Sequence, residues 1–473
     1  MYKLLALVFV FIQLVLPQSK NKLLIVILTT GKHSSYHGSK VAIDLLNSYY
    51  NISDFLEFEF RFDDGNEGLA VKHVVDILKQ NRSIDAVIGS QRSACSMALA
   101  QILKHYEIPQ VSPNSASPLL SDKDEYPFFL RMTNSALERN LVRIEILKHF
   151  NWRRVFLITE AVEFFYKIYD HFHVEAAQSN ITIVKNFIIH SNDDLKNIVQ
   201  ELIQEDARIV VTLAYSFITR HFLCQAYKNS YYGDRHVILF PSNMNQQILS
   251  EITQKQYGCS KEEAGLVLEG NLRESGIDMA NETYKPYGNP IFNIADLVEK
   301  IHDSMNNSYN LGYAGNGFDA VMTTAKTFEK ILRNKSNFSS SILSGKTLLR
   351  NLLEADFDGI LGKINFDDNG NLKRDIVIQQ YSRSHSYDAK TVGFYDGVTG
   401  GIHFTLDPFP HIPNDDRIRQ TIVESITYTR SLDMELAPSY PCLMHCSSER
   451  SHDRTTLNNI SPMVTPVKLS SIS

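Results

Sequence analysis

The N-terminal third of the sequence alternates between short apolar runs and longer segments whose apolar residues recur at helical spacing. KLLIVILTT is almost entirely apolar, which is typical of a strand buried on both faces. GSKVAIDLLNSYYN follows it with the periodicity of a helix that buries one face. The alternation continues through LEFEFRFDD, GLAVKHVVDILKQN, IDAVIGS, SMALAQILKHYE and IPQVSPNSAS. Strands and helices that alternate in this way predict a doubly wound parallel α/β sheet with right-handed crossovers.

A second series of the same kind follows the helix predicted for ALERNLVRIEILKHF. It runs through RRVFLITE, ITIVKNFII, DDLKNIVQELIQED, ARIVVTLAY, ITRHFLCQAYKNSYY and HVILFPS. A chain of 473 residues is long enough for more than one hydrophobic core. We therefore predict two parallel-sheet lobes joined by a hinge, with residues 20–150 in the first lobe and residues 151–280 in the second.

The pattern changes in residues 281–412, which are predicted to return to both lobes and complete them. Helices are expected at FNIADLVEKIHDSMNN, FDAVMTTAKTFEKILRN and GKTLLRNLLEA. GKINFDDNGNLKRDIVIQQY has Asn-Gly between alternating segments and predicts a hairpin, and TVGFYDGVTGGIHF predicts a further strand pair. Residues 413–473 lose periodicity and are rich in Ser, Thr and Arg, so a disordered tail is expected there.

The N-terminus indicates the compartment. Residues 1–19 contain one lysine and then an apolar run from Leu4 to Leu16 that only Gln13 interrupts. This run has the length of a signal-peptide core and is short for a membrane span, so we predict a signal peptide. A buried strand or an anchor is the alternative. Sequons that favour a secreted glycoprotein occur at Asn51, Asn81, Asn180, Asn281, Asn306, Asn334 and Asn337, with a weaker one at Asn459.

The five cysteines, Cys95, Cys224, Cys259, Cys442 and Cys446, are an odd number for a secreted chain, so at least one is a free or intermolecular thiol. Cys442, His445 and Cys446 lie close enough to hold a metal together. They supply three ligands where a structural zinc site needs four, so a pair of tail cysteines is the favoured interpretation.

Composition and motifs argue against several functions. A net charge of −6 gives no excess of cations for nucleic acid or an anionic membrane. The sequence contains no Gly-rich phosphate loop, no complete nucleophile elbow, no HExxH and no paired-cysteine metal site. We therefore expect no enzymatic activity, no cofactor and no metal.

Polar residues stand where predicted strands end and predicted helices begin. Ser93 lies in this position in VIGSQRSACS, Ser115 and Ser117 in VSPNSASPLLS, and Tyr215 in LAYSFIT from the second series. Ligands of open α/β sheets bind at the carboxyl ends of strands, close to helix N-termini. These residues predict a cleft for a small polar ligand between two lobes. For each single serine, helix N-capping is the alternative.

Taken in order, these segments resemble the extracellular ligand-binding region of class C G-protein-coupled receptors, and in particular metabotropic GABA (GABA-B) receptor subunits. The resemblance covers most of residues 22–410. It is most specific in YPFFLRMTNSALERNLVRIEILKHFNWRRVFLITE, in DARIVVTLAYSFITRHFLCQAYKNSYYGDRHVILF, in FDAVMTTAKTFEKIL and in FDGILGKINFDDNG. It implies the bilobed fold of type I periplasmic binding proteins, which natriuretic-peptide receptors share. It also implies a disulfide between Cys224 and Cys259, whereas the family's first-lobe disulfide has no counterpart here.

The resemblance also implies a set of ligand-binding residues. Tyr215 matches the second-lobe tyrosine that closes on the ligand, and Ser93 matches the first-lobe serine that bonds the ligand carboxylate. Other positions depart from the family pattern, with Ala116 where a second serine is expected, although Ser115 is adjacent. Thr133 replaces a histidine, Asn243 a tryptophan, and Tyr313 the glutamate that pairs with the ligand ammonium. The loss of this acid argues against GABA itself, because an unpaired buried ammonium costs several kcal/mol.

The function that the resemblance implies is a receptor ectodomain that closes on a small amino-acid-like ligand and rearranges a homo- or heterodimer with another receptor subunit. Three alternatives stay open: a partner subunit that binds no agonist, a secreted decoy, and the ectodomain of a receptor guanylate cyclase. A receptor of this family continues into seven membrane helices, which this chain does not contain. The expected location is the extracellular side of the plasma membrane or, for a complete chain of this length, the secreted space.

Overall fold

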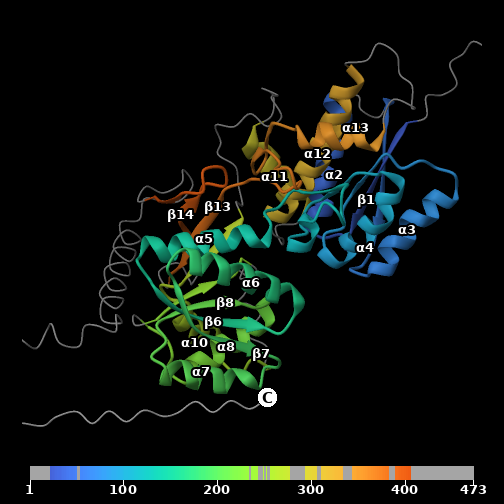
Figure 1. Ribbon diagram of the computed structural model, residues 1–473. Helices are drawn as coiled ribbons and strands as arrows, with labels where there is room; N and C mark the ends of the chain where they lie inside the picture. Colours follow the sequence, from blue (N-terminus) through green and yellow to red (C-terminus); the bar gives the residue numbers. More distant parts are fainter. Residues whose placement is uncertain are drawn as a thin grey trace, which may run out of the picture.

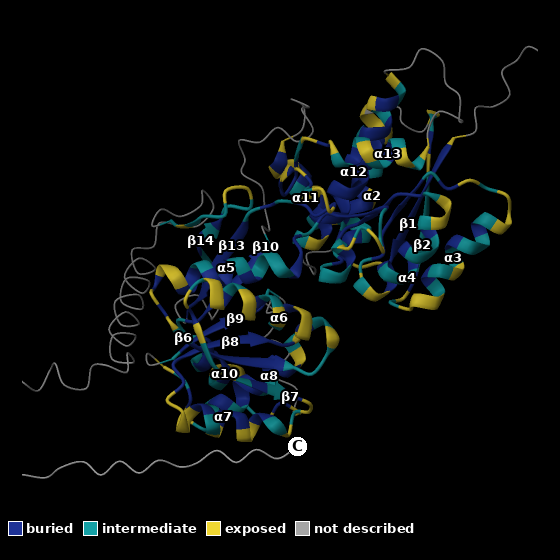
Figure 2. Cartoon of the chain, in the orientation of Figure 1, coloured by how far each residue is buried: buried dark blue, intermediate teal, exposed yellow. Residues whose placement is uncertain are grey.

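Two parallel-rich sheets form the frame of the protein in a computed structural model (Figure 1). The structure describes residues 22–50, 54–233, 236–242, 249, 252, 256–276, 293–305, 311–333, 344–382 and 389–405. Each sheet carries helices on both faces, and central strands of both sheets are buried along their whole length (Figure 2). The predicted bilobed α/β architecture is therefore confirmed.

The first lobe is built on a five-stranded sheet of order β2-β1-β3-β4-β5, in which every neighbouring pair is parallel. Its strands are β1 (Leu23–Thr29), β2 (Leu56–Phe62), β3 (Ala86–Ile88), β4 (Gln110–Ser112) and β5 (Phe129–Arg131). All seven residues of β1 are buried, because helices cover both faces of this central strand. Helices α3 (Glu67–Lys79) and α4 (Ser93–Leu103) pack on one face and α2 (Ser34–Tyr50) on the other.

The second lobe contains an eight-stranded sheet of order β15-β14-β13-β10-β9-β8-β6-β7. Its strands are β6 (Arg154–Glu160), β7 (Thr182–Ile189), β8 (Ile209–Leu213), β9 (Val237–Phe240), β10 (Leu272–Gly276), β13 (Ile376–Tyr381), β14 (Ala389–Tyr395) and β15 (Ile402–Phe404). The strands from β7 to β10 are parallel, and β13, β14 and β15 extend them antiparallel. Helix α6 (Glu163–Gln178) covers one face. Helices α7 (Asp194–Gln204), α8 (Ser216–Lys228) and α10 (Lys261–Leu268) cover the other.

Helix α5 (Ala136–His149) precedes residue 150, where the sequence places the end of the first lobe, yet its apolar side chains pack in the core of the second lobe. The chain therefore passes to the second lobe directly after β5. It returns after β10, because α11 (Ile294–Ser304), α12 (Leu311–Arg333) and α13 (Gly345–Leu353) pack in the first lobe. The chain crosses to the second lobe once more before β13. The crossing after β5 and the crossing before β13 are in contact, because Asn134 Nδ2 donates to the carbonyl of Arg374 at 2.8 Å.

The Asn-Gly segment forms a turn, but the hairpin predicted around it is largely wrong. The amide of Gly370 donates to the carbonyl of Asp367 at 2.9 Å, and a single antiparallel bridge joins Phe366 to Leu372. The residues on either side belong to different sheets. Strand β12 (Gly362–Ile364) pairs with β11 (Phe357–Gly359), whereas β13 pairs with β10 and β14 in the second lobe. The pair predicted for TVGFYDGVTGGIHF is confirmed as β14 and β15.

Candidate ligand-binding site

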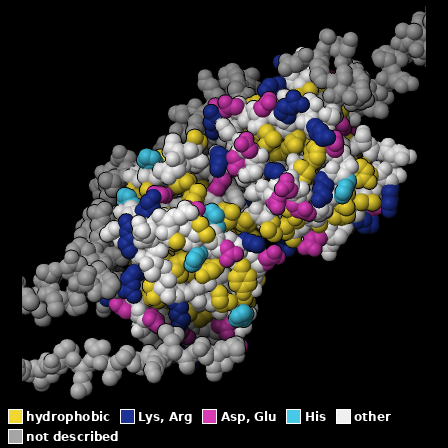
Figure 3. All heavy atoms as spheres, in the orientation of Figure 1, with side chains coloured by type: hydrophobic (Ala, Val, Ile, Leu, Met, Phe, Trp, Pro, Cys, Tyr) yellow, Lys and Arg dark blue, Asp and Glu magenta, His cyan; other side chains and the backbone are white. Residues whose placement is uncertain are grey.

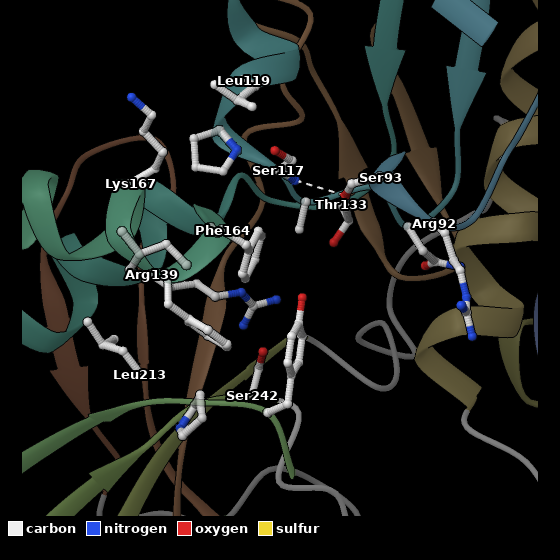
Figure 4. A pocket seen from close by; sticks show the side chains of 18 of the residues that line it. Arg92, Ser93, Ser117, Leu119, Thr133, Arg139, Phe164, Lys167, Leu213 and Ser242 are labelled. Atoms are coloured by element: carbon white, nitrogen blue, oxygen red, sulfur yellow. Dashed lines mark hydrogen bonds between the residues drawn. The ribbon is translucent and has the colours of Figure 1, made fainter. Parts of the chain in front are cut away.

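A cleft with a volume of about 800 Å³ lies between the lobes, and side chains from both lobes line it (Figure 4). Ser93, at the start of α4, and Thr133, after β5, contribute from the first lobe. Phe164 of α6 and Ser242, which follows β9, contribute from the second. Because parallel strands end at the same edge of a sheet, both sheets present their strand-to-helix loops to this space. The cleft is large enough for an amino-acid-sized molecule.

The sequence-predicted site residues separate into three groups. Five of them line the cleft: Ser93, Ala116, Thr133, Tyr215 and Tyr313. Ser115 lies behind the cleft wall, where it is fully buried and its Oγ lies 2.9 Å from Ser96 Oγ. Asn243 lies outside the described residues. Geometry thus brings together most of the set that the resemblance implies, from segments far apart in the chain.

Ser93 is not the N-cap of its helix. Arg92 occupies the N-cap position, and Ser93 is the first helical residue. The Ser93 Oγ accepts a hydrogen bond of 3.2 Å from the amide of Ser117 (Figure 4). One hydroxyl hydrogen bond is therefore used to hold the loop after β4, and the hydroxyl proton is left to donate to a ligand oxygen. Ser93 therefore does not cap α4, which was the alternative explanation for a serine at this position.

Tyr215 is the residue between β8 and α8, and two contacts position it. Its amide donates to Glu160 Oε2 at 2.8 Å, which ties the loop to the end of β6. Its ring stacks on Phe164 with centroids 6.2 Å apart and meets the edge of Phe165 at 4.8 Å. The side chain keeps 47% of its surface exposed. Burial and, secondarily, the Glu160 carboxylate raise the pKa of the Tyr215 phenol, so the hydroxyl is a neutral donor at physiological pH.

Three of the helices that begin at this cleft have no side chain that caps the first turn. They are α4, α6 and α8, whose N-cap residues are Arg92, Val162 and Tyr215. Ser135 caps α5, whose first residue also lines the cleft, and helices that begin elsewhere are capped by Asn66, Ser260, Asn293 and Ser344. Uncapped first turns leave backbone amides without intrahelical partners, and the helix dipole adds partial positive charge. The cleft is therefore suited to an anionic group.

Two arginines on α5 were missed by sequence reasoning. Arg139 and Arg143 lie one helical turn apart and both line the cleft. Arg143 forms a buried ion pair with Glu274, with 2.5 Å between Nη2 and Oε1, and donates to Asn140 Oδ1 at 2.6 Å. The signal available in the sequence was the spacing of two cations, four residues apart, within ALERNLVRIEIL, which places both on the same face of the helix.

Tyr313, in the first turn of α12, provides a phenol where the family pattern has a glutamate, and it is 51% exposed. The carboxylates that do line the cleft come from other elements. Glu274 is committed to Arg143, and Glu163 is exposed in the first turn of α6. Within the described ranges, no group of three or more His, Cys, Asp or Glu residues could hold a metal ion.

Cys224 and Cys259 form the disulfide that the resemblance implied, with their Cα atoms 5.4 Å apart. It links α8 to the segment before α10 on the outer side of the second sheet. Cys95 is a buried thiol in α4. The segment predicted to be a signal peptide, Cys442, His445 and Cys446 all lie outside the described residues.

The described sequons are those of Asn81 and Asn180. Both asparagines are exposed, and each follows a helix with a positive φ, of 57° and 55° respectively. Their side chains are accessible to a glycan. Asn51, Asn281, Asn306, Asn334, Asn337 and Asn459 lie in parts of the chain that the structure does not describe.

None of the described helices is both long enough and apolar enough to cross a bilayer. On the face drawn in Figure 3, cationic and anionic side chains are interspersed over both lobes.

Comparison with known proteins gives a consistent result. Residues 35–384 match the family described as the receptor family ligand binding region. The chain is 22% identical to mouse gamma-aminobutyric acid type B receptor subunit 1 over 374 residues, which is 76% of this chain and 38% of that protein. It is 22% identical to human gamma-aminobutyric acid type B receptor subunit 2 over 375 residues, or 75% of this chain and 38% of that protein.

A shorter match joins the chain to the probable metabotropic glutamate receptor mgl-1 of Caenorhabditis elegans, at 30% identity over 149 residues. This covers 30% of the chain and 15% of that protein. The chain as a whole spans 38% of the length of the mouse and human relatives above, so activities of those complete proteins do not transfer to it by similarity alone.

Proposed function

The chain belongs to the family of receptor ligand-binding regions, and from this membership we propose that it is a GABA-B-like class C receptor ectodomain that binds a small amino-acid-like ligand between its lobes. The ligand binds in the cleft, and the two lobes close on it. Closure is transmitted to a second receptor subunit in a homo- or heterodimer. The protein acts by binding and not by catalysis, on the extracellular side of the plasma membrane as part of a receptor or as a secreted chain.

The observation that supports this proposal most strongly is the joint lining of one cleft by Ser93 of the first lobe and Tyr215 of the second. The Tyr215 ring is held from behind by Phe164 and Phe165 and is about half exposed. The Arg92 guanidinium is close enough to Tyr215 to oppose the rise in the pKa of its phenol, although burial dominates. A small movement of one lobe would therefore press the ring onto a molecule bound at the start of α4.

A partner subunit that binds no agonist is the second candidate, and Tyr313 is the observation that favours it. The resemblance places a ligand-pairing glutamate at this position, and a phenol does not carry the negative charge that an ammonium group needs. In this second case the lobes would contribute through contacts with the partner subunit.

The thermal midpoint of the full secreted chain distinguishes the two candidates. It would be measured alone and with a panel of amino acids, GABA, small amines and small carboxylic acids. A compound present at 100 times its dissociation constant adds about 2.7 kcal/mol of stability, which is a clear shift. A shift that Tyr215→Ala reduces and Tyr166→Ala does not would support ligand binding in the cleft. No shift with any compound would contradict it and favour the partner subunit.

A further inference from the structure

Arg139 extends from α5 into the cleft, where its guanidinium lies among the lining side chains (Figure 4). The Nη1 atom is buried from solvent and has no hydrogen-bond partner among the described residues. The side chain also takes part in no ion pair within that part of the structure. A guanidinium carries five N–H donors and keeps its charge in proteins. A desolvated donor of this kind is costly until a partner reaches it.

The surroundings of Arg139 do not supply this partner. Glu274 is the carboxylate whose charge most favours the protonated guanidinium, but its Oε1 is already bonded to Arg143 Nη2. Burial is the larger effect and lowers the pKa of Arg139, as expected for a cation that has lost part of its hydration without full compensation. The other carboxylate at the cleft, Glu163, is exposed in the first turn of α6.

Other features of the cleft also add positive charge to it. Arg92 and Lys167 also line it, so cations outnumber carboxylates among the lining residues. Helices α4, α6 and α8 turn their uncapped N-termini toward it, two of them from the second lobe and one from the first. Backbone amides and a guanidinium are both donors that suit carboxylate oxygens.

The cleft therefore offers two separate anion-binding positions. The first is the start of α4, where the Ser93 hydroxyl and the free amides of the first turn lie in the first lobe. The second is Arg139, whose helix packs in the core of the second lobe. Tyr313 lies near Arg139 and places a hydroxyl group where a carboxylate would have paired with an ammonium group.

We propose that this cleft selects a small organic acid with two anionic groups, one bound at the start of α4 and the other by Arg139. This inference rests on the proposed function, because it identifies the ligand class of the same site. A molecule that carries a carboxylate at each end bridges the two lobes and stabilises the closed form. A cationic amine is not required for binding.

Glutarate and GABA test this directly, because glutarate carries a carboxylate in place of the amine of GABA on the same three-methylene chain. Binding of each to the full secreted chain would be measured by titration calorimetry and by thermal shift. Glutarate is expected to bind at least tenfold more tightly than GABA. Arg139→Gln should weaken glutarate binding roughly 10- to 100-fold, as expected for the loss of a charge-assisted hydrogen bond. Arg139→Lys, which keeps the charge but not the paired donors, should retain part of the affinity.

Lys196→Gln is the matched control, because it makes the same change of charge on an exposed position of α7 outside the cleft. The unliganded Arg139→Gln variant is expected to be at least as stable as the wild type, since it removes a desolvated cation that has no described partner. A midpoint that falls by more than about 5 °C would instead identify Arg139 as a structural residue and overturn the inference.

Equal affinity of wild type and Arg139→Gln for glutarate, or tighter binding of GABA than of glutarate, would also overturn the inference. If GABA or another amino acid binds and Tyr215→Ala weakens it, the proposed function survives and only the ligand class is wrong. If no compound binds to the wild type, both fail together.

Discussion

Replacement of Tyr215 by alanine separates the role of this ring in the fold from its role in ligand binding. The ring is 47% exposed, so it buries about half of the surface that a tyrosine can. Half of roughly 150–250 Å² is about 100 Å², and about 25 cal/mol per Å² gives an upper estimate of about 2.5 kcal/mol. Residual compactness of the unfolded chain reduces this to about 1.5–2 kcal/mol. The loop itself should persist, because its anchor to Glu160 uses the Tyr215 backbone amide.

The exposed half of the ring is the surface available to a ligand. Its loss should weaken binding by about 1–3 kcal/mol, or roughly 5- to 150-fold in the dissociation constant. Urea unfolding of the unliganded chain measures the first quantity, and titration with the compound that gives the largest thermal shift measures the second. Tyr215→Phe should retain most of the stability but lose the hydroxyl contact.

Tyr166→Ala is the control for both measurements, because Tyr166 lies on α6 of the same lobe, is 38% exposed and does not line the cleft. An unchanged dissociation constant in Tyr215→Ala, together with a loss of stability above about 3 kcal/mol, would refute the reasoning. In that case Tyr215 would be a core residue and not a ligand contact.

Three further predictions concern the fold. Replacing both Cys224 and Cys259 by alanine should lower the free energy of unfolding in urea by about 2–4 kcal/mol, because the bridge closes a loop with a sequence separation of 35 residues. An unchanged free energy of unfolding would mean that the bridge does not restrict the unfolded chain. Gly38→Ala should destabilise the first lobe despite its better helix propensity, because the new Cβ would lie 1.8 Å from the Ala314 carbonyl oxygen of α12. Gly68→Ala in α3 should cost much less, because its new Cβ would meet only Asn66 Oδ1, at 3.3 Å, and equal midpoints for the two variants would contradict this packing. Burial lowers the pKa of His171 from its ordinary value of 6.5, with Glu175 opposing the shift, so the folded chain takes up this proton less readily than the unfolded chain and stability should fall as pH drops below 6.5 toward the folded pKa. His171→Gln should flatten this slope in urea unfolding between pH 7.5 and 5.5, and an unchanged slope would assign the dependence to other groups.

The elements that sequence reasoning identified best are those whose pattern reflects local burial. Strand β1 is buried at every position, as its apolar run predicts. Strand β10 was missed because its sequence, LRESG, contains buried charges. Arg273 Nε donates to Gln379 Oε1 at 2.8 Å, and Glu274 pairs with Arg143. These partners are more than 100 positions away in the chain, so no local pattern could reveal that the strand is in the core.

The hairpin was misplaced for a related reason. An Asn-Gly turn specifies a local reversal, and the turn at Gly370 is present. It does not specify whether the flanking strands continue to pair, and here β13 leaves to extend the second sheet. Such a choice depends on which sheet edge is available in the folded chain.

The candidate site was predictable in outline only. The positions of Ser93 and Tyr215 follow from the rule that ligands bind where strands end, and the resemblance named them individually. The placement of Ser115 behind the wall depends on how the loop after β4 packs against Ser96. The place of Arg139 in the cleft could not be predicted from the sequence. It depends on the packing of α5 in the second lobe, which directs this side chain into the cleft.

Hydrogen–deuterium exchange of the full secreted chain tests the central claim most directly, namely that one ligand is held by both lobes at once. Exchange would be compared with and without glutarate or GABA, whichever binds. The account predicts slower exchange on ligand binding in the first turn of α4 and in the first turn of α8, with no change in α7 on the outer face of the second lobe. Protection confined to one lobe, or protection at a surface away from Ser93 and Tyr215, would contradict it.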